Sequence, residues 1–235
     1  IQYLLRDTSL ASYHEEEYDL MQDTVAAYSS SPAFAGNLIA DEPGPSKFDN
    51  LAQLHEAYKK VLPDKVFYVN LFPTYSSLAQ REGVDYKDYV QQYIDKVKPG
   101  VFSFDYYPLM KNVQGTAIKE DYLNNLDIVA NACKKANIPF WSFIQAMEFT
   151  TAGMTNRSPN ENDIRWQVFT NLAFGAQGIQ YFCYWTPGND GSASLGTAIF
   201  TDRIGSSSTA PAFSSASLMP MRAAVRKAMS EESTV

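Results

Sequence analysis

Cysteine and histidine are scarce in this sequence of 235 residues, and each occurs only twice. Two cysteines exclude a disulfide-stapled scaffold and a four-thiolate zinc site. Cys133 falls in a helical pattern and Cys183 in an apolar run, so we expect both to be buried thiols. His14 lies in an acidic run and His55 on an amphipathic helical pattern, where we expect both to be solvated. These absences argue against a Ser-His-Asp triad, a multi-histidine metal site and a bound cofactor.

Positive charge and long apolar runs are lacking as well. The formal net charge is −7, and Lys and Arg do not cluster on any segment, which argues against a nucleic-acid or anionic-membrane partner. No apolar run approaches the roughly 18 residues that a membrane span needs. The chain is 45% hydrophobic and 14% aromatic, which excludes disorder, and its length fits one domain over residues 1–235.

Five apolar runs rich in aromatic and β-branched residues predict buried strands. They cover residues 37–40, 66–72, 101–104, 140–144 and 179–185. The runs are nearly continuous rather than alternating, which is typical of a parallel sheet covered on both faces. Amphipathic patterns predict helices over residues 13–28, 48–62, 86–97, 122–136 and 161–175. A strand followed by a helix, repeated, indicates βα units.

The spacing of the strands favours a barrel. The predicted strands recur about every 35 residues, and eight such units need about 280 residues, the usual size of the (β/α)8 fold. We therefore predict an α/β fold, a (β/α)8 TIM barrel in which residues 1–5 form the third strand. The first two strands are then expected to be missing from this chain, which begins at Ile1. An open doubly wound sheet, which needs no missing strands, is the alternative.

Polar and aromatic residues follow the predicted strands at their carboxyl ends, where parallel α/β folds place reactive groups. The candidate catalytic carboxylates are Asp41, Glu42, Asp105 and Glu148. The residues that we expect to bind substrate are Asn70, Tyr106, Tyr107, Trp141, Gln145, Tyr184 and Trp185. No Lys or Arg lies at these strand ends and no glycine-rich loop follows them, which argues against a phosphate site.

Paired carboxylates with aromatic platforms suit the chemistry of sugars. Cleavage of a glycosidic bond needs a proton for the leaving oxygen and stabilisation of an oxocarbenium-like state, and apolar sugar faces stack on Trp and Tyr. Glu42 is the best candidate acid, because the neighbouring charge of Asp41 tends to raise one pKa of the pair. Structural roles also exist for these residues: Asp41 and Asp105 can cap turns, and Trp141 can belong to the core. Their shared position at one rim favours function.

Residues 31–43, which end in Asn-Leu-Ile-Ala-Asp-Glu-Pro, resemble the fourth strand of clan A glycoside hydrolases, where P-x-x-x-G-W-x-x-x-N-E-P carries the general acid/base. Residues 137–145 are similar to the seventh strand of that clan. Residues 165–185 are similar to the last helix and strand of barrels related to β-galactosidases, and the combination resembles glycoside hydrolases of Bacteroidetes polysaccharide systems. The resemblance implies cleavage of O-glycosidic bonds in an oligo- or polysaccharide, with Glu42 as acid/base. It also implies a secreted, periplasmic or cell-surface bacterial protein.

Two departures from the clan pattern leave the mechanism open. Asp41 stands where the clan has Asn, and Gln145 stands where a nucleophilic Glu is expected, with Glu148 three residues later. The alternatives are a retaining enzyme, a substrate-assisted hexosaminidase that uses the Asp41–Glu42 pair, and an inverting enzyme with Asp105 or Glu148 as base. A carbohydrate-binding barrel without catalysis is the rival from another class. An aldolase is disfavoured because no predicted strand ends in Lys.

Overall fold

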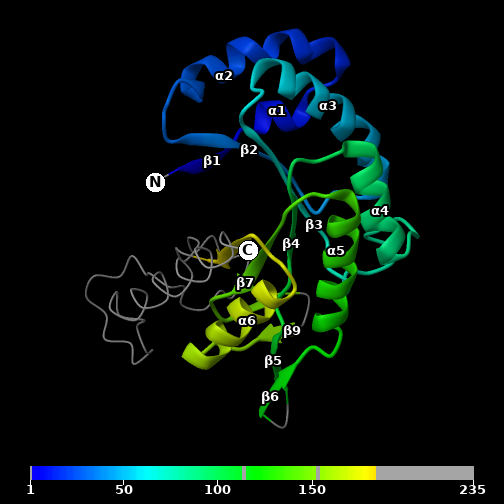
Figure 1. Ribbon diagram of the computed structural model, residues 1–235, viewed down its shortest axis with the longest axis vertical. Helices are drawn as coiled ribbons and strands as arrows, with labels where there is room; N and C mark the ends of the chain where they lie inside the picture. Colours follow the sequence, from blue (N-terminus) through cyan, green and yellow to red (C-terminus); the bar gives the residue numbers. More distant parts are fainter. Residues whose placement is uncertain (1, 113–114, 152–153, 184–235) are drawn as a thin grey trace, which may run out of the picture.

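The computed structural model describes residues 2–112, 115–151 and 154–183, and it shows an α/β fold around a curled parallel sheet of six strands (Figure 1). In spatial order the strands are β1 (Tyr3–Arg6), β2 (Phe34–Asp41), β3 (Val66–Leu71), β4 (Phe102–Asp105), β7 (Phe140–Gln145) and β10 (Gly178–Phe182). Each neighbouring pair is parallel. The predicted strands and the parallel sheet are thus confirmed, with β1 and β10 as the edges in the described part of the chain.

Helices connect each strand to the next. The elements before β2 are α1 (Thr8–Ser12), the 3-10 helix η1 (Glu15–Leu20) and α2 (Met21–Ser29). The later connections carry the 3-10 helix η2 (Pro45–Lys47), α3 (Phe48–Val61), α4 (Tyr86–Val97), α5 (Tyr122–Ala136) and α6 (Glu161–Ala173). The single helix expected over residues 13–28 is wrong, because a capping box between His14 and Glu17 starts a separate 3-10 helix. No helix among the described residues has the length and apolar character to cross a membrane.

The order of the strands distinguishes the two predicted folds. A doubly wound sheet reverses its strand order at a switch point, whereas this sheet follows the chain order from β1 to β10 without reversal. Figure 1 shows α3, α4 and α5 in succession along one side of the sheet. This arrangement belongs to a partial TIM-like barrel, and six parallel strands of it are seen in the described residues.

The main core lies between this sheet and its helices. Alternate strand residues such as Val69 and Phe104 are fully buried against Tyr93 of α4 and other helical residues. Cys133 is buried there, as predicted. The expectation that His55 is solvated is wrong: its ring packs 4.7 Å from that of Phe67, and its Nδ1 lies 2.9 Å from a main-chain oxygen of α4.

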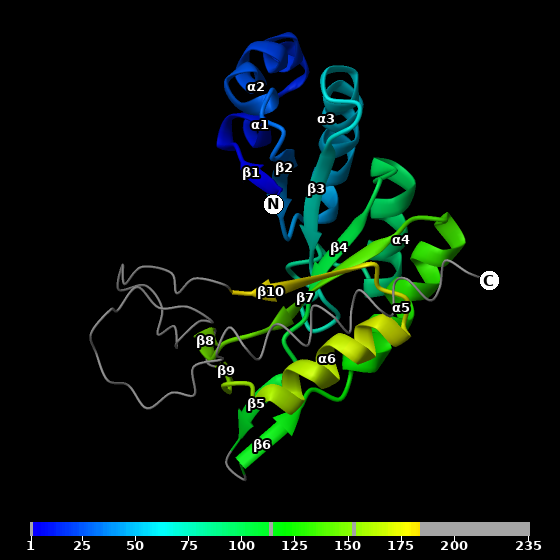
Figure 2. The same cartoon turned by 60° about the vertical axis from the view of Figure 1, so that its left-hand side comes forward.

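A second, antiparallel sheet follows the carboxyl ends of β4 and β7, and the sequence did not indicate it. Its strands are β5 (Leu109–Asn112), β6 (Gly115–Ile118), β8 (Phe149–Thr151) and β9 (Met154–Asn156), in the order β6-β5-β9-β8. Figures 1 and 2 place it at the end of the molecule opposite α2. Strands of three or four residues are too short to show a periodic pattern, which is why they were missed.

Candidate active site

Three carboxylates gather around one amide side chain at the carboxyl end of the parallel sheet. Asn70 Nδ2 donates to Oδ1 of Asp41 at 3.1 Å and to Oδ1 of Asp105 at 2.8 Å. The main-chain oxygen of Asn70 accepts a hydrogen bond of 2.8 Å from the main-chain nitrogen of Glu42. Asn70 of β3 therefore connects the ends of β2 and β4. The structure brings Asp41, Glu42, Asn70 and Asp105 together in one place.

An irregularity in β2 turns Asp41 toward this group. Leu38 pairs with Tyr68 and Ala40 with Val69, so Ile39 is an extra residue on β2. Such a bulge shifts the alternation of side chains by one position, and Asp41 consequently faces the same side of the sheet as its partner Asn70.

Glu42, the next residue, leaves the strand with a left-handed backbone, φ 49°. This conformation costs a residue other than glycine about 1–2 kcal/mol. Strain of this kind is retained where the surrounding structure imposes it, and it concentrates at functional sites.

A chain of hydrogen bonds on the inner face of the sheet fixes the orientation of the Asn70 amide. Ser103 Oγ donates to Asn70 Oδ1 at 3.3 Å. The hydroxyl of Tyr68 lies 2.5 Å from the same Ser103 oxygen, and Gln180 Nε2 donates to Tyr68 at 2.7 Å. Because Oδ1 of Asn70 is engaged as an acceptor, its Nδ2 is the atom that faces the carboxylates. The amide is thus held in the orientation that stabilises negative charge on Asp41 and Asp105.

The environment moves the pKa values of Glu42 and Asp105 upward by different amounts. Burial, followed by the negative charges of Asp105 and Asp41, raises the pKa of Glu42 to about 8. Burial raises the pKa of Asp105 to about 6, while the Asn70 amide and a hydrogen bond from Tyr107 oppose the rise. Near pH 7 Glu42 is therefore protonated and Asp105 is mostly ionised. One carboxyl group that can give a proton beside another that can accept one is the arrangement of acid–base catalysis.

Two half-buried tyrosines stand beside the carboxylates. Burial and the charges of Asp105 and Glu42 raise the pKa of the hydroxyls of both Tyr75 and Tyr107. Lys119 packs on Tyr75, with its Nζ 3.2 Å from the centre of the ring. Tyr75 follows the end of β3 in the sequence, and this position was the signal that could have found it. Lys119 follows β6, where no motif marked it.

Other predicted binding residues have different surroundings. Tyr106 is fully buried: its ring packs 4.9 Å from Tyr75, and its hydroxyl donates to Asp121, so it supports the loops. Trp141 is half-buried on the inner face, with its ring 6.0 Å from that of Tyr68. The Trp141 indole also lies against Gly178, where a Cβ atom would be only 2.5 Å from it. Tyr184 and Trp185 lie outside the described residues.

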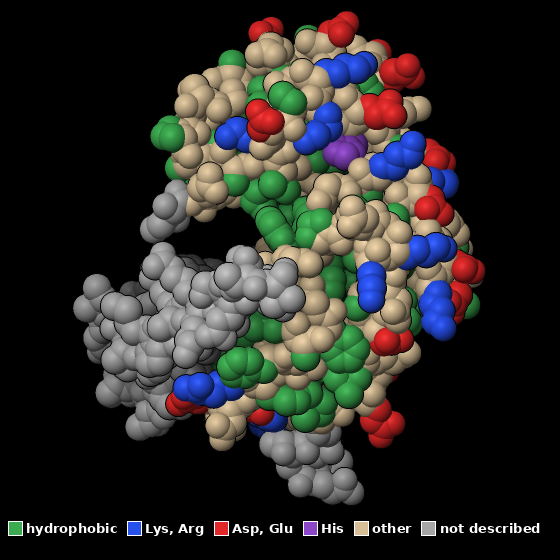
Figure 3. All heavy atoms as spheres, viewed as in Figure 1, with side chains coloured by type: hydrophobic (Ala, Val, Ile, Leu, Met, Phe, Trp, Pro, Cys, Tyr) green, Lys and Arg blue, Asp and Glu red, His purple; other side chains and the backbone are tan. Residues whose placement is uncertain are grey.

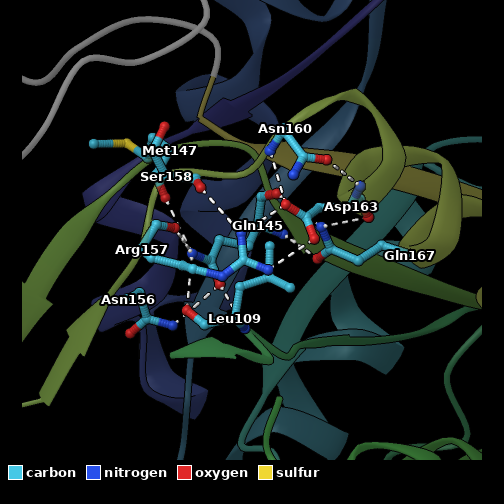
Figure 4. A network of polar contacts seen from close by, with 9 residues as sticks. All are labelled: Leu109, Gln145, Met147, Asn156, Arg157, Ser158, Asn160, Asp163 and Gln167. Atoms are coloured by element: carbon cyan, nitrogen blue, oxygen red, sulfur yellow. Dashed lines mark hydrogen bonds and ion pairs between the residues drawn. The ribbon is translucent and has the colours of Figure 1, made fainter. Parts of the chain in front are cut away.

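Gln145 stands where a nucleophile was considered, and the structure gives it an internal role (Figure 4). Its side chain is fully buried. Its Oε1 accepts from the main-chain nitrogen of Leu109 at 3.0 Å and from Asn156 Nδ2 at 3.1 Å. Its Nε2 donates to main-chain oxygens, the shortest bond being 2.7 Å to Arg157. Gln145 therefore joins β7 to the small sheet, and protein groups occupy both polar atoms of its side chain.

The residues around Gln145 also bond to other protein groups. Gln167 of α6 accepts a hydrogen bond from the main-chain nitrogen of Gln145 and donates to its oxygen, at 2.9 and 3.0 Å. Arg157 forms a two-pronged ion pair with Asp163 at 2.6 and 2.7 Å (Figure 4). Glu148 lies in the link between β7 and β8, and in the described part of the chain it makes no hydrogen bond or ion pair. Within the described residues, Glu148 therefore has no bond to Asp41, Glu42, Asn70 or Asp105.

The opposite end of the sheet carries a shallow groove of about 380 Å³ between the last turns of α3 and α4. Four lysines line it, namely Lys59, Lys60, Lys96 and Lys98. A cation at the carboxyl end of a helix interacts favourably with the negative end of the helix dipole. This stabilisation explains the lysines without a ligand. Figure 3 shows Lys and Arg interspersed with Asp and Glu over the face that it presents.

Two solved structures with a similar arrangement of strands and helices bear the names of glycosidases. A β-galactosidase from a psychrophilic Marinomonas aligns with a TM-score of 0.55 at 13% identity, over 84% of this chain and 43% of that chain. A proposed α-L-fucosidase from Bacteroides thetaiotaomicron aligns with a TM-score of 0.50 at 12% identity, over 73% of this chain and 54% of that chain. The chain thus spans about half the length of these structures, and identities this low show a shared fold.

Comparison of the sequence itself adds no assignment. The chain matches no protein-family model. It matches no curated protein either. Among the residues that the structure describes, no three His, Cys, Asp or Glu side chains are grouped so that they could hold a metal ion.

Proposed function

We propose that this chain is the catalytic part of a glycoside hydrolase that cleaves O-glycosidic bonds, with Glu42 as general acid. The observation that carries the proposal is the cluster in which Asn70 Nδ2 donates to both Asp41 and Asp105 while the main chain of Asn70 holds Glu42. The higher pKa of Glu42, about 8, compared with about 6 for Asp105, agrees with it. Glycosidases need one protonated and one ionised carboxyl group at the scissile bond. The fold that the chain shares with glycosidases supports the same function.

In this proposal Glu42 gives its carboxyl proton to the glycosidic oxygen while the bond from that oxygen to the anomeric carbon breaks. Asp105 stabilises the positive charge that develops at the anomeric carbon, and it takes the proton of the water that attacks there. Glu42 then takes a proton from solvent and Asp105 releases one to solvent, which returns both groups to their starting states. Asn70 keeps Asp105 ionised by donating to it, and Tyr75 and Tyr107 offer aromatic surface to the sugar ring. Asp105 takes this role because Gln145 is engaged by main-chain groups and no contact ties Glu148 to the site.

We propose that the six parallel strands belong to a complete (β/α)8 barrel formed as one domain, whose rim surrounds the sugar. Trp185 and Tyr184, which the resemblance places on the last strand, are proposed to line the same site. A secreted, periplasmic or cell-surface location is also proposed, and it rests on the resemblance to polysaccharide-degrading enzymes.

The experiment is a screen of the full-length protein against aryl glycosides of both anomeric forms and against polysaccharides, with release of the aryl group or of reducing ends as the readout. Glu42→Gln should reduce the rate on a cleaved substrate by about 100- to 10,000-fold. Glu148→Gln tests the competing carboxylate, and Glu56→Gln, on the exposed surface of α3, controls for loss of one charge. NMR of the first product anomer should show inversion. Normal turnover by Glu42→Gln would refute the assignment.

A sugar-binding protein without catalysis is the second candidate. One observation favours it: β7 carries the structural amide of Gln145 where the resemblance expects a nucleophile. Calorimetry that detects sugar binding, together with no release of reducing ends after days with any substrate, would favour this candidate over the hydrolase.

A further inference from the structure

Lys119 is a half-buried cation beside the candidate site, and its position is fixed by the main chain. Its main-chain nitrogen donates to the oxygen of Pro108 at 2.9 Å, which attaches the end of β6 to the turn that follows Asp105. Its Nζ lies 3.2 Å from the ring centre of Tyr75 and 5.6 Å from that of Tyr106. The ammonium group thus packs on the ring of Tyr75, and the charges of Asp105 and Glu42 raise the pKa of the hydroxyl of that same tyrosine.

Asp121, two residues further along the chain, makes no ion pair with Lys119 among the described residues. Both oxygens of Asp121 are engaged elsewhere: one accepts from the hydroxyl of Tyr106, and the other accepts from Thr74 Oγ1 at 2.5 Å. Within the described residues Lys119 forms no ion pair, and its Nζ donates no hydrogen bond. Burial lowers its pKa to about 8, while the nearby charges of Asp121 and Asp105 oppose the decrease, so the group is charged at pH 7 with no carboxylate in contact with it.

A partly desolvated ammonium group without an anion in direct contact is costly for the protein. The face of Tyr75 compensates for part of this cost through a cation–π contact, yet a tyrosine ring leaves the three N–H donors of the group unused. An anionic group on a bound ligand supplies the acceptors. The location beside the carboxylates around Asn70 places that anion on the sugar whose bond Glu42 is proposed to protonate.

We propose that Lys119 selects a sugar with an anionic substituent, either the carboxylate of a uronic acid or a sulfate ester, in the ring that stacks near Tyr75. The inference rests on the proposed function for the identity of the ligand as a sugar. It adds a substrate class, acidic glycosides, and a residue that determines specificity. Asp41 and Asp105 repel such a substrate, and Lys119 provides the positive charge that offsets this repulsion at short range.

The test compares matched aryl glycosides that differ in one group: glucoside with glucuronide, galactoside with galacturonide, and each neutral sugar with its 6-sulfate, in both anomeric forms. The wild-type protein should favour the acidic partner of at least one pair by 10-fold or more in kcat/KM. Lys119→Gln should lower this preference by about 10- to 100-fold, as expected for loss of a charged hydrogen bond. Lys119→Arg should retain it. Whether the uronide or the sulfate shows the effect identifies the anion.

Lys111→Gln is the matched control, because Lys111 lies on β5 of the same hairpin, is exposed, and carries the same charge. It should leave the preference unchanged. Equal preference for acidic and neutral partners in the wild-type protein would overturn the inference, and so would an equal loss of preference in both lysine variants, which would indicate only the general field of the protein.

A binding measurement separates this inference from the proposed function. Calorimetry on Glu42→Gln with glucuronate, galacturonate and their neutral sugars needs no catalysis. Uronate binding that disappears on adding Lys119→Gln, without hydrolysis of any glycoside by the wild-type protein, would support the site and overturn the proposed hydrolase. Hydrolysis that depends on Glu42 but shows no preference for acidic sugars would support the proposed hydrolase and overturn the role of Lys119. Binding of neither kind of sugar, with no hydrolysis, would overturn both.

Discussion

Asn70 and Asp105 come from neighbouring strands, and the amide nitrogen of Asn70 donates to the carboxylate of Asp105 at 2.8 Å. The same nitrogen donates to Asp41, and the main chain of Asn70 holds Glu42. A single residue, Asn70, therefore contacts all three acidic residues, two through its side chain and one through its main chain. Without this donor, like charges at such close range would be relieved by protonation.

Replacement of Asn70 by Ala should reduce kcat/KM on a cleaved glycoside by about 10- to 1,000-fold, as for loss of one charge-stabilising donor. The pKa of Asp105 should rise, because the hydrogen bond that lowers it is lost. The acidic limb of the pH–rate profile should then move to higher pH. Asn37→Ala is the control: Asn37 is also buried, but it bonds to Tyr58 at the opposite end of the sheet. Asn37→Ala should lower stability without moving the limb, and an unmoved limb in Asn70→Ala would contradict the role of Asn70.

Activity should have a bell-shaped dependence on pH. The rate should rise as Asp105 ionises near pH 6 and fall as Glu42 loses its proton near pH 8. Asp105→Asn should remove the acidic limb. It should also move the alkaline limb to lower pH, because the charge of Asp105 is one of the causes that raise the pKa of Glu42. Profiles of kcat/KM on a neutral substrate measure both limbs, and an alkaline limb that stays in place would show that the two groups do not interact.

Glu42→Gln should stabilise the fold even as it removes activity. The pKa of Glu42 is raised from 4.5 to about 8, so its contribution to stability is fully present below pH 4.5 and is lost as pH rises through 8. Gln has no charge to lose, so the variant should be more stable by about 1–2 kcal/mol above pH 8, a figure reduced for partial exposure. The gain should vanish below pH 4.5. Urea unfolding of both proteins at pH 4 and 8.5 measures it, and a variant less stable at pH 8.5 would count against the assignment.

Gln145→Glu restores the residue type that the clan resemblance expects, yet it should not produce a better enzyme. The Nε2 atom of Gln145 faces main-chain oxygens of Leu109, Met147 and Arg157, which repel a carboxylate. The free energy of unfolding should fall by about 3–5 kcal/mol at neutral pH, the cost of an unpaired buried charge. Gln177→Glu is the control, because this exposed side chain only accepts a hydrogen bond from Phe140. A stable and more active Gln145→Glu would show that Gln145 faces the substrate.

Much of the fold follows from the sequence because each βα unit carries its own pattern. The helices at 86–97 and 122–136 were predicted to the residue, since their apolar stripes begin and end at clear boundaries. The gathering of Asp41, Asn70 and Asp105 was expected because parallel strands end at one edge. What could not be predicted is the bulge at Ile39, which arises from pairing with β3 and not from local preference.

The sequence also could not show which groups surround each buried polar residue. Asn70 lies within one apolar run and Gln145 directly follows another. Main-chain groups of the small sheet bind Gln145, whereas Asn70 donates to carboxylates. No sequence pattern predicted the small sheet. The burial of Gln145 and the position of Lys119 beside Tyr75 therefore could not be predicted either. Both depend on contacts between segments that are distant along the chain.

The central claim is that Glu42 keeps its proton at neutral pH. Carbon-13 NMR of protein with labelled Glu side chains follows each carboxyl group through its titration, and the signal absent from Glu42→Gln identifies Glu42. We predict a midpoint near pH 8, moving to lower pH in Asp105→Asn. A midpoint near 4.5, the ordinary value, would contradict the account.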